Sequence, residues 1–217
     1  MIEQNQHTIQ VSEKLGEVSG ISLIPADASL ILVLAHGAGA GMQHFFMEDL
    51  ANQLAANGIA TFRYNLHYME HGKKRPDPPA IAHKTISMVA DYVHTNYPSL
   101  KIYLSGKSFG GRMSSQLMAK SPLDYVHGLI FYGFPLHAIG KDGVERAEHL
   151  SEINVPMLFL QGTKDKLARL DLIESVTADL SNTQLTILEG ADHSFKVKKE
   201  TLIQELVNGT IDWVKRI

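Results

Sequence analysis

Hydrophobic positions along this chain alternate between two patterns. Short apolar runs predict strands, and longer stretches with apolar residues at helical spacing predict helices. The run at residues 30–35 is apolar throughout rather than at every second position, which is typical of a strand buried on both faces of a sheet. Further strands are predicted at residues 59–64, 101–104, 129–132, 156–160 and 184–188. Helices are predicted at residues 46–57, 81–97, 109–120, 144–150, 167–180 and 198–216, with a loop at 66–79.

Two further strands, at residues 8–11 and 18–24, precede this alternating part and are close enough to form a hairpin. Strands that alternate with helices form a parallel sheet with helices on both faces. The sequence therefore predicts an α/β fold: a three-layer sandwich with a mostly parallel sheet of about eight strands. Because no repeat and no change in composition divides the chain, residues 1–217 are expected to form a single domain.

Composition excludes several classes of protein. With 44% hydrophobic and 20% charged residues, the chain is not disordered. A net charge of −3 argues against a nucleic-acid-binding protein. The absence of cysteine excludes disulfides, thiolate metal sites and cysteine nucleophiles. No signal peptide is visible at residues 1–10, and no apolar run approaches the roughly 20 residues of a membrane span, so we expect a cytoplasmic protein.

The most informative motif is Gly106-Lys107-Ser108-Phe109-Gly110, which lies between a predicted strand and a predicted helix. This is the context of a nucleophile elbow, in which a serine on a sharp turn projects above the sheet. Small residues are needed two positions away because strand and helix come close there. We therefore predict Ser108 as the nucleophile and the N–H of Phe109 as an oxyanion donor. A phosphate-binding P-loop is excluded, because Lys101 stands where that motif needs glycine.

A serine nucleophile needs a general base, and His193 is the preferred one of 11 histidines. It follows the last predicted strand, and the chain order Ser, Asp, His is that of hydrolases with such an elbow. Asp165, directly after the preceding strand, is the predicted acid that orients His193. Asp192 and Asp171 are weaker candidates for this acid.

A second glycine-rich segment, His36-Gly37-Ala38-Gly39-Ala40-Gly41, also joins a buried strand to a helix. With Arg63 at the end of the next strand, it could belong to an NADP-binding unit. That fingerprint needs glycine at the position of Met42, so the dinucleotide interpretation is disfavoured. In a hydrolase the same loop supplies the second oxyanion N–H, and Ala38 is the predicted donor.

Together, the segments HGAGAG, GKSFGG, GTKD and GADH resemble the α/β-hydrolase superfamily over nearly the whole chain. The segment FRYNLHYMEHGKKRPDPP, with GKSFGGR, is similar to a small lidless branch related to dienelactone hydrolases. This resemblance implies that no cofactor is needed, and residues 133–154 are too few for a separate cap domain. Dienelactone hydrolases use a cysteine nucleophile, which this chain lacks, so oxygen-ester or thioester chemistry is favoured.

Residues that could bind the substrate are aromatic and lie near the predicted site. The expected pocket residues are Phe45, Tyr68, Tyr132 and Phe134. His67 and His71 have metal-ligand spacing, but no third ligand is evident, so no metal is expected.

The sequence thus predicts a serine hydrolase that cleaves a carboxylic ester or related acyl bond of a small molecule through an acyl-enzyme. A thioesterase or peptidase using the same three residues remains an alternative, as does a C–C hydrolase. The alternative from another class is a non-catalytic, hydrolase-like binding module.

Overall fold

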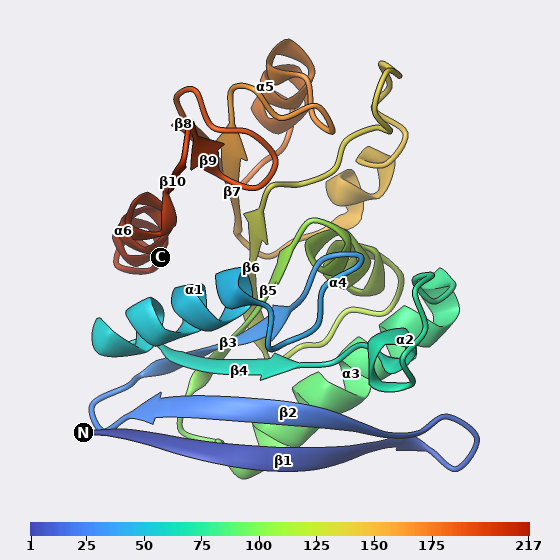
Figure 1. Cartoon of the computed structure of the whole chain (residues 1–217), viewed down its shortest axis with the longest axis vertical. Helices are drawn as coiled ribbons and strands as arrows, with labels where there is room; N and C mark the ends of the chain where they lie inside the picture. Colours follow the sequence, from blue (N-terminus) through green and yellow to red (C-terminus); the bar gives the residue numbers. More distant parts are fainter.

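The computed structural model describes residues 1–217, and a single eight-stranded sheet runs through its centre (Figure 1). The strands of this sheet are β1 (Ile2–Ser12), β2 (Gly16–Pro25), β3 (Leu30–Ala35), β4 (Ala60–Tyr64), β5 (Lys101–Lys107), β6 (Val126–Tyr132), β7 (Met157–Gly162) and β8 (Thr183–Leu188). The helices are α1 (Phe45–Ala56), α2 (His67–Glu70), α3 (Pro79–Asn96), α4 (Phe109–Lys120), α5 (Leu170–Ala178) and α6 (Ile203–Val214), with a 3₁₀ helix η1 (Glu148–Glu152). A small hairpin, β9 (Lys196–Val197) with β10 (Glu200–Thr201), precedes α6.

The order of strands across the sheet is β1-β2-β4-β3-β5-β6-β7-β8. Strand β2 runs antiparallel to both of its neighbours, and every pairing from β4 to β8 is parallel. The predicted α/β fold, with its mostly parallel sheet of eight strands and its initial hairpin, is confirmed. Parallel strands place their carboxyl ends along one edge of the sheet, so the loops after β3, β5, β7 and β8 come close together there.

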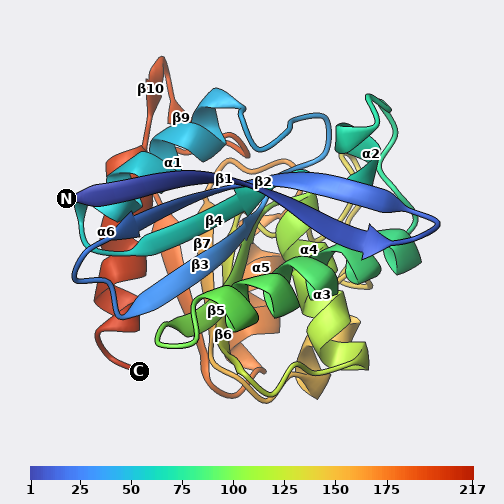
Figure 2. The same cartoon turned by 90° about the horizontal axis from the view of Figure 1, so that it is seen from below.

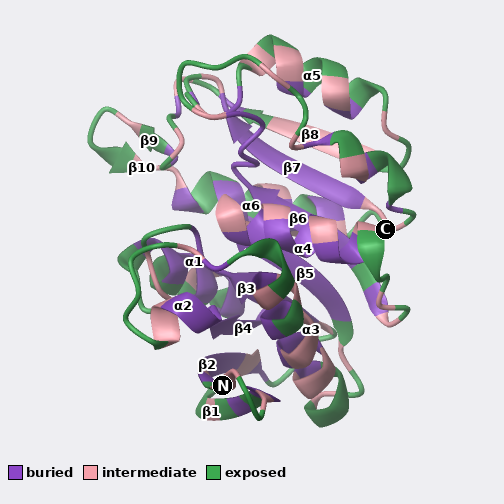
Figure 3. Ribbon diagram, turned by 90° about the vertical axis from the view of Figure 1, so that its right-hand side faces the viewer, coloured by how far each residue is buried: buried purple, intermediate pink, exposed green.

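Two hydrophobic cores lie on opposite faces of the sheet, because successive side chains of a strand point to opposite sides. In β3, Leu32 and Leu34 face one core, whereas Ile31 and Val33 face the other. Helices α1 and α6 cover the first face, and α3, α4 and α5 cover the second (Figure 2). The central strands are buried on both faces, as the apolar run at 30–35 predicts (Figure 3).

The structure departs from the predicted elements at some of their ends and in two of the connecting segments. Strand β1 begins at Ile2 rather than at residue 8, because its first residues are polar and solvent-exposed and give no hydrophobic pattern. The last helix begins at Ile203 rather than at 198, since Lys198 adopts a left-handed φ of 57° within the β9–β10 hairpin. The predicted helix at 144–150 is instead η1, and the predicted loop at 66–79 contains α2. None of the helices is both long and apolar enough to cross a membrane.

Candidate active site

The backbone reverses direction sharply between β5 and α4, and Ser108 occupies this turn. Its φ of 49° and ψ of −111° lie in a region that residues other than glycine rarely adopt. The glycines on either side are required by close packing. A Cβ at Gly106 would lie 2.5 Å from the backbone nitrogen of Gly111, and one at Gly110 would lie 2.6 Å from the carbonyl oxygen of Ala35. The motif therefore folds as a strained strand–turn–helix that presents the serine hydroxyl above the sheet.

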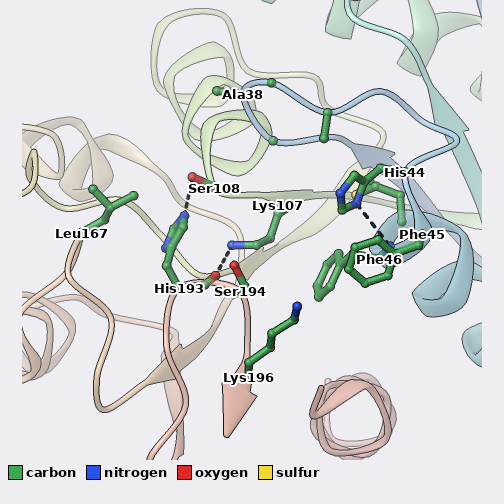
Figure 4. Close-up of a pocket in the computed structure, with 14 residues that line it drawn as sticks. Ala38, His44, Phe45, Phe46, Lys107, Ser108, Leu167, His193, Ser194 and Lys196 are labelled. Atoms are coloured by element: carbon green, nitrogen blue, oxygen red, sulfur yellow. Dashed lines mark hydrogen bonds between the residues drawn. The ribbon is translucent and has the colours of Figure 1, made fainter. Parts of the chain in front are cut away.

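Three side chains from separate loops form one hydrogen-bonded chain at the carboxyl edge of the sheet. Nε2 of His193 lies 2.9 Å from Oγ of Ser108, and Nδ1 lies 2.7 Å from Oδ2 of Asp165 (Figure 4 shows the first of these contacts). Asp165 follows β7, and His193 follows β8. With the imidazole neutral, Nδ1–H donates to the carboxylate and Nε2 accepts from the serine hydroxyl.

The carboxylate of Asp165 is fixed by further donors. Its Oδ2 also accepts a hydrogen bond of 2.6 Å from Nε2 of Gln161, and its Oδ1 accepts one of 2.8 Å from the backbone N–H of Leu167. The Asp165 side chain is only 1% exposed, whereas that of His193 is 25% exposed. The carboxylate is therefore buried beneath the imidazole, whereas part of the imidazole is accessible to solvent.

The two weaker candidates for this acid serve other purposes. Oδ1 of Asp192 accepts the backbone N–H groups of Ser194 and Lys196, at 2.8 and 3.0 Å, and so closes the turn that carries the histidine. Asp171 pairs with Arg169 on the surface of the molecule. Neither carboxylate is hydrogen-bonded to His193.

The glycine-rich loop after β3 is fixed by buried polar groups. His36 is fully buried; its Nδ1–H donates to the carbonyl of Gly37 at 2.9 Å, and its Nε2 accepts the N–H of Leu66 at 2.9 Å. The hydroxyl of Tyr68 donates to the same Gly37 carbonyl at 3.2 Å. Burial lowers the pKa of His36 to about 4, so the imidazole is neutral in this arrangement. The loop thereby holds Ala38 in the wall of the cavity that Ser108 also lines, described below (Figure 4).

Arg63 does not face a ligand site. Its Nη1 donates to the carbonyl of Met42 at 3.2 Å, its Nη2 lies 3.8 Å from Glu48, and the residue is 2% exposed. The guanidinium thus supports the chain just after the glycine-rich loop and is not placed to meet a 2′-phosphate.

A cavity of about 440 Å³ opens in front of Ser108 (Figure 4). Apolar groups and cations line it, and no carboxylate does. The lining residues are Gly37, Ala38, Gly39, Ala40, His44, Phe45, Phe46, Met47, Lys107, Ser108, Leu167, His193, Ser194 and Lys196.

Of the four aromatic residues predicted to contact substrate, the structure places only Phe45 in this cavity, with 59% of its surface exposed. The expectation needs correction for the other three. Tyr132 is buried and bonds Thr210 at 3.0 Å; Phe134 packs in the core; and Tyr68 is buried against the glycine-rich loop. These three side chains are buried in the protein and do not line the cavity, which is consistent with the gain from burying large apolar surfaces.

Several cavity residues were missed by sequence reasoning, and Lys107 is the most notable. Its ammonium donates to the backbone carbonyl of His193 at 2.6 Å (Figure 4). Burial lowers the pKa of Lys107 to about 8, while nearby Asp165 and Asp192 act in the opposite direction. The lysine occupies a variable position of the elbow motif, so the motif gave no signal for it. The other missed residues are His44, Leu167 and Lys196.

His67 is the first residue of α2 and His71 caps its C-terminus, with the two ring centres 4.2 Å apart. His67 contacts Asp77 at 3.3 Å through Nδ1, and Nδ1 of His71 donates to the carbonyl of His67. No group of three or more His, Cys, Asp or Glu side chains in the structure is arranged to hold a metal ion.

Both the fold and the elbow geometry define a class, that of the hydrolases built on a mostly parallel α/β sheet. The family model of the alpha/beta hydrolase domain matches residues 28–212. The chain therefore belongs to the α/β-hydrolase family, and the predicted superfamily is confirmed.

Solved structures with a similar fold support this classification. A dienelactone hydrolase from Anabaena variabilis aligns with a TM-score of 0.82 at 20% identity, over 99% of this chain and 98% of its own. An α/β serine hydrolase homologue from Coxiella burnetii aligns with a TM-score of 0.77 at 21% identity, over 94% and 96%. A serine hydrolase without a lid from Xanthomonas campestris aligns with a TM-score of 0.76 at 19% identity, over 99% and 94%. The predicted relation to dienelactone hydrolases and lidless hydrolases agrees with these folds.

Proposed function

We propose that this protein is a serine hydrolase that cleaves a carboxylic ester or a related acyl bond of a small molecule through an acyl-enzyme. The observation that carries the proposal is the hydrogen-bonded chain from Asp165 through His193 to Ser108, on a serine held in strained geometry. A purely binding role would require neither the strain nor the aligned imidazole. Serine hydrolases and esterases among the structures of similar fold add support.

In the proposed mechanism, Oγ of Ser108 attacks the substrate carbonyl carbon while Nε2 of His193 takes the hydroxyl proton. Asp165 stabilises the imidazolium that forms and keeps Nδ1 protonated. The tetrahedral intermediate then collapses: the bond to the leaving group breaks, and His193 returns the proton to that group. A water molecule, deprotonated by His193, attacks the acyl-enzyme carbonyl, and Ser108 is released with its proton restored.

The oxyanion of each tetrahedral intermediate needs donors on the side of Ser108 away from His193. We assign this role to the backbone N–H groups of Phe109 and Ala38. Phe109 is the first residue of α4, so its N–H has no acceptor one turn earlier in the helix. Ala38 lies in the cavity wall, and the buried His36 fixes the loop that carries it. The positive end of the α4 dipole adds to the stabilisation.

We further propose that residues 1–217 act as one domain, without a cap and without a cofactor. The connection between β6 and β7, where larger relatives insert a cap, contains η1 as its only helix. The cavity is large enough for a small acyl substrate, and its apolar lining suits the acyl chain.

Covalent labelling with a fluorophosphonate probe, followed by peptide mass spectrometry, tests the proposal. We expect the adduct on Ser108, and Ser108→Ala should prevent labelling and reduce hydrolysis of p-nitrophenyl esters by about 10³-fold or more. Ser194→Ala removes the other serine of the cavity and is the matched control, which should keep both activities. A folded wild-type protein that is neither labelled nor active on oxygen esters, thioesters or peptides would favour a binding module instead.

A further inference from the structure

We propose that Lys107 is a positioning residue, whose ammonium fixes the loop of His193 against the nucleophile turn. This inference rests on the proposed function, because it concerns the alignment of His193 with Ser108. Lys107 directly precedes Ser108 in the chain, and its ammonium donates a hydrogen bond to the backbone carbonyl of His193, whose imidazole contacts Ser108. Figure 4 shows its side chain extending from the serine turn to the histidine loop.

His193 is thereby held at three points. Asp165 accepts from Nδ1, Ser108 contacts Nε2, and the lysine binds the main-chain carbonyl at 2.6 Å. The two side-chain contacts set the plane of the ring, but the position of the ring also depends on where its Cα lies. The third contact joins the backbone of His193 to Lys107, the last residue of β5, which directly precedes Ser108. The contact therefore helps to fix the distance from Nε2 of His193 to Oγ of Ser108.

Two aromatic rings and a stretch of backbone flank the ammonium and restrict its movement. Its Nζ is 5.1 Å from the ring centre of Phe195 and 6.0 Å from that of Phe46, both distances at which aromatic faces attract a cation. A Cβ added at Gly133 would lie 3.1 Å from the same Nζ, so the backbone after β6 closes the other side. The lysine has few alternative positions, and its hydrogen bond is correspondingly well defined.

Fold stability does not explain this arrangement. Lys107 has no carboxylate within ion-pair distance, although its side chain is partly buried. Asp165 and Asp192 are near enough to favour the charged form of the lysine but form no ion pair with it, and an apolar side chain of similar length would fill the same space without the cost of desolvating a charge. A residue that costs stability at the centre of a site is best explained by the geometry that it maintains there.

The loop that carries His193 needs such support, because its backbone is irregular. Phe195, two residues further on, has a left-handed φ of 58°. The carboxylate of Asp192 closes the turn by accepting the backbone N–H groups of Ser194 and Lys196. Without the lysine, the carbonyl of His193 loses its side-chain donor. A displacement of the imidazole by about 1 Å is enough to reduce the rate about 10²-fold.

The test compares Lys107→Met, which keeps the length and apolar packing of the side chain, with Lys107→Arg, which keeps a cationic donor. We expect Lys107→Met to lower kcat and the rate of fluorophosphonate labelling by about 10- to 100-fold, with KM changed less than about twofold. Its urea unfolding midpoint should not fall, and Lys107→Arg should recover part of kcat. The matched control is Lys101→Met, at the exposed lysine on the opposite end of β5, far from the cavity lining, which should keep kcat within about twofold. If the methionine variant does not fold, Lys107→Gln serves for the same comparison.

Three results for Lys107→Met would overturn the proposal. The first is an unchanged kcat, and the second is a change in KM alone, which would place the lysine against the substrate. The third is a loss of activity that is fully explained by a loss of folded protein. Failure of the proposed function is distinguishable, because the wild type would then not be labelled at Ser108. In that case the downfield N–H resonance of the His193–Asp165 hydrogen bond still reports on positioning. It should broaden or shift in Lys107→Met and stay unchanged in Lys101→Met, and an unchanged resonance in both would refute the role of Lys107.

Discussion

Oδ2 of Asp165 lies 2.7 Å from Nδ1 of His193, although 28 residues separate them, whereas the adjacent Asp192 turns its carboxylate toward the backbone of its own loop. Only one of these two acids is hydrogen-bonded to the imidazole, so substituting each of them should affect kcat/KM differently. Asp165→Asn should reduce kcat/KM by up to about 10⁴-fold, because an amide at this position favours the wrong imidazole tautomer. Circular dichroism should show a native fold.

Asp192→Asn is the matched control for this substitution. The asparagine keeps an oxygen that can accept the N–H groups of Ser194 and Lys196, so kcat/KM should fall by less than about tenfold. If Asp192→Asn were the more damaging change, Asp165 would not be the residue that orients the imidazole.

Gly110 should be among the least tolerant positions of the fold. A methyl group there would lie 2.6 Å from the carbonyl oxygens of both Ala35 and His36, which belong to the backbone and cannot move aside. Gly110→Ala should lower the free energy of unfolding by about 3 kcal/mol, measured by urea denaturation, and should reduce esterase activity as well.

Gly209→Ala provides the comparison, because it also adds a methyl group to a helix glycine. The nearest atom there is Cδ2 of Leu160, at 2.7 Å, the end of a flexible side chain that can rotate. The gain in helix propensity, about 1 kcal/mol, offsets this contact, so the unfolding free energy should change little. Equal effects of the two substitutions would contradict the argument.

His36 should make the fold sensitive to acid. Its pKa is lowered by burial to about 4, whereas an unfolded chain has a histidine pKa near 6.5. Below about pH 6.5 this histidine binds a proton in the unfolded state but stays neutral in the native state, so the free energy of unfolding falls as the pH is lowered to about 4. Between pH 7 and pH 5, the wild type should lose about 2 kcal/mol more than His36→Gln, measured by urea denaturation at both pH values. Equal losses in both proteins would show that His36 does not carry the effect.

Phe45 and Tyr132 should separate substrate binding from stability. Phe45 is the exposed aromatic residue of the cavity, so Phe45→Ala should raise KM for p-nitrophenyl esters of longer acids and barely change the unfolding midpoint. Tyr132→Phe removes a buried hydrogen bond to Thr210; it should cost about 1 kcal/mol of stability and leave KM unchanged. A Tyr132→Phe variant with a raised KM would place that residue in the binding site after all.

Much of the fold was predictable because burial leaves a pattern in the sequence. The continuous apolar run of β3 and the alternation of strands and helices defined the sheet, and helix α4 was predicted with its observed limits. The hairpin around Lys198 was not predictable in this way. Its residues are charged and exposed, and a single left-handed residue ends a pattern that would otherwise continue as helix.

The candidate site was predictable to the extent that its chemistry depends on chain order and on turns. Ser108, Asp165 and His193 lie together because parallel strands place their carboxyl ends along one edge; their catalytic roles stay a prediction. The direction of a side chain beyond that edge depends on tertiary packing, which periodicity does not encode. Tyr132 accordingly turned into the core, and Lys107 turned toward the histidine without any signal in the sequence.

The separation of 85 residues between Ser108 and His193 has a consequence during synthesis of the chain. At about 5–20 residues per second, the serine leaves the ribosome several seconds before the histidine is made. During that interval the nascent chain carries the hydroxyl without the imidazole that would withdraw its proton. Under the proposed mechanism, Ser108 can therefore act as a nucleophile only after translation has passed β8 and the loop that carries His193 has docked.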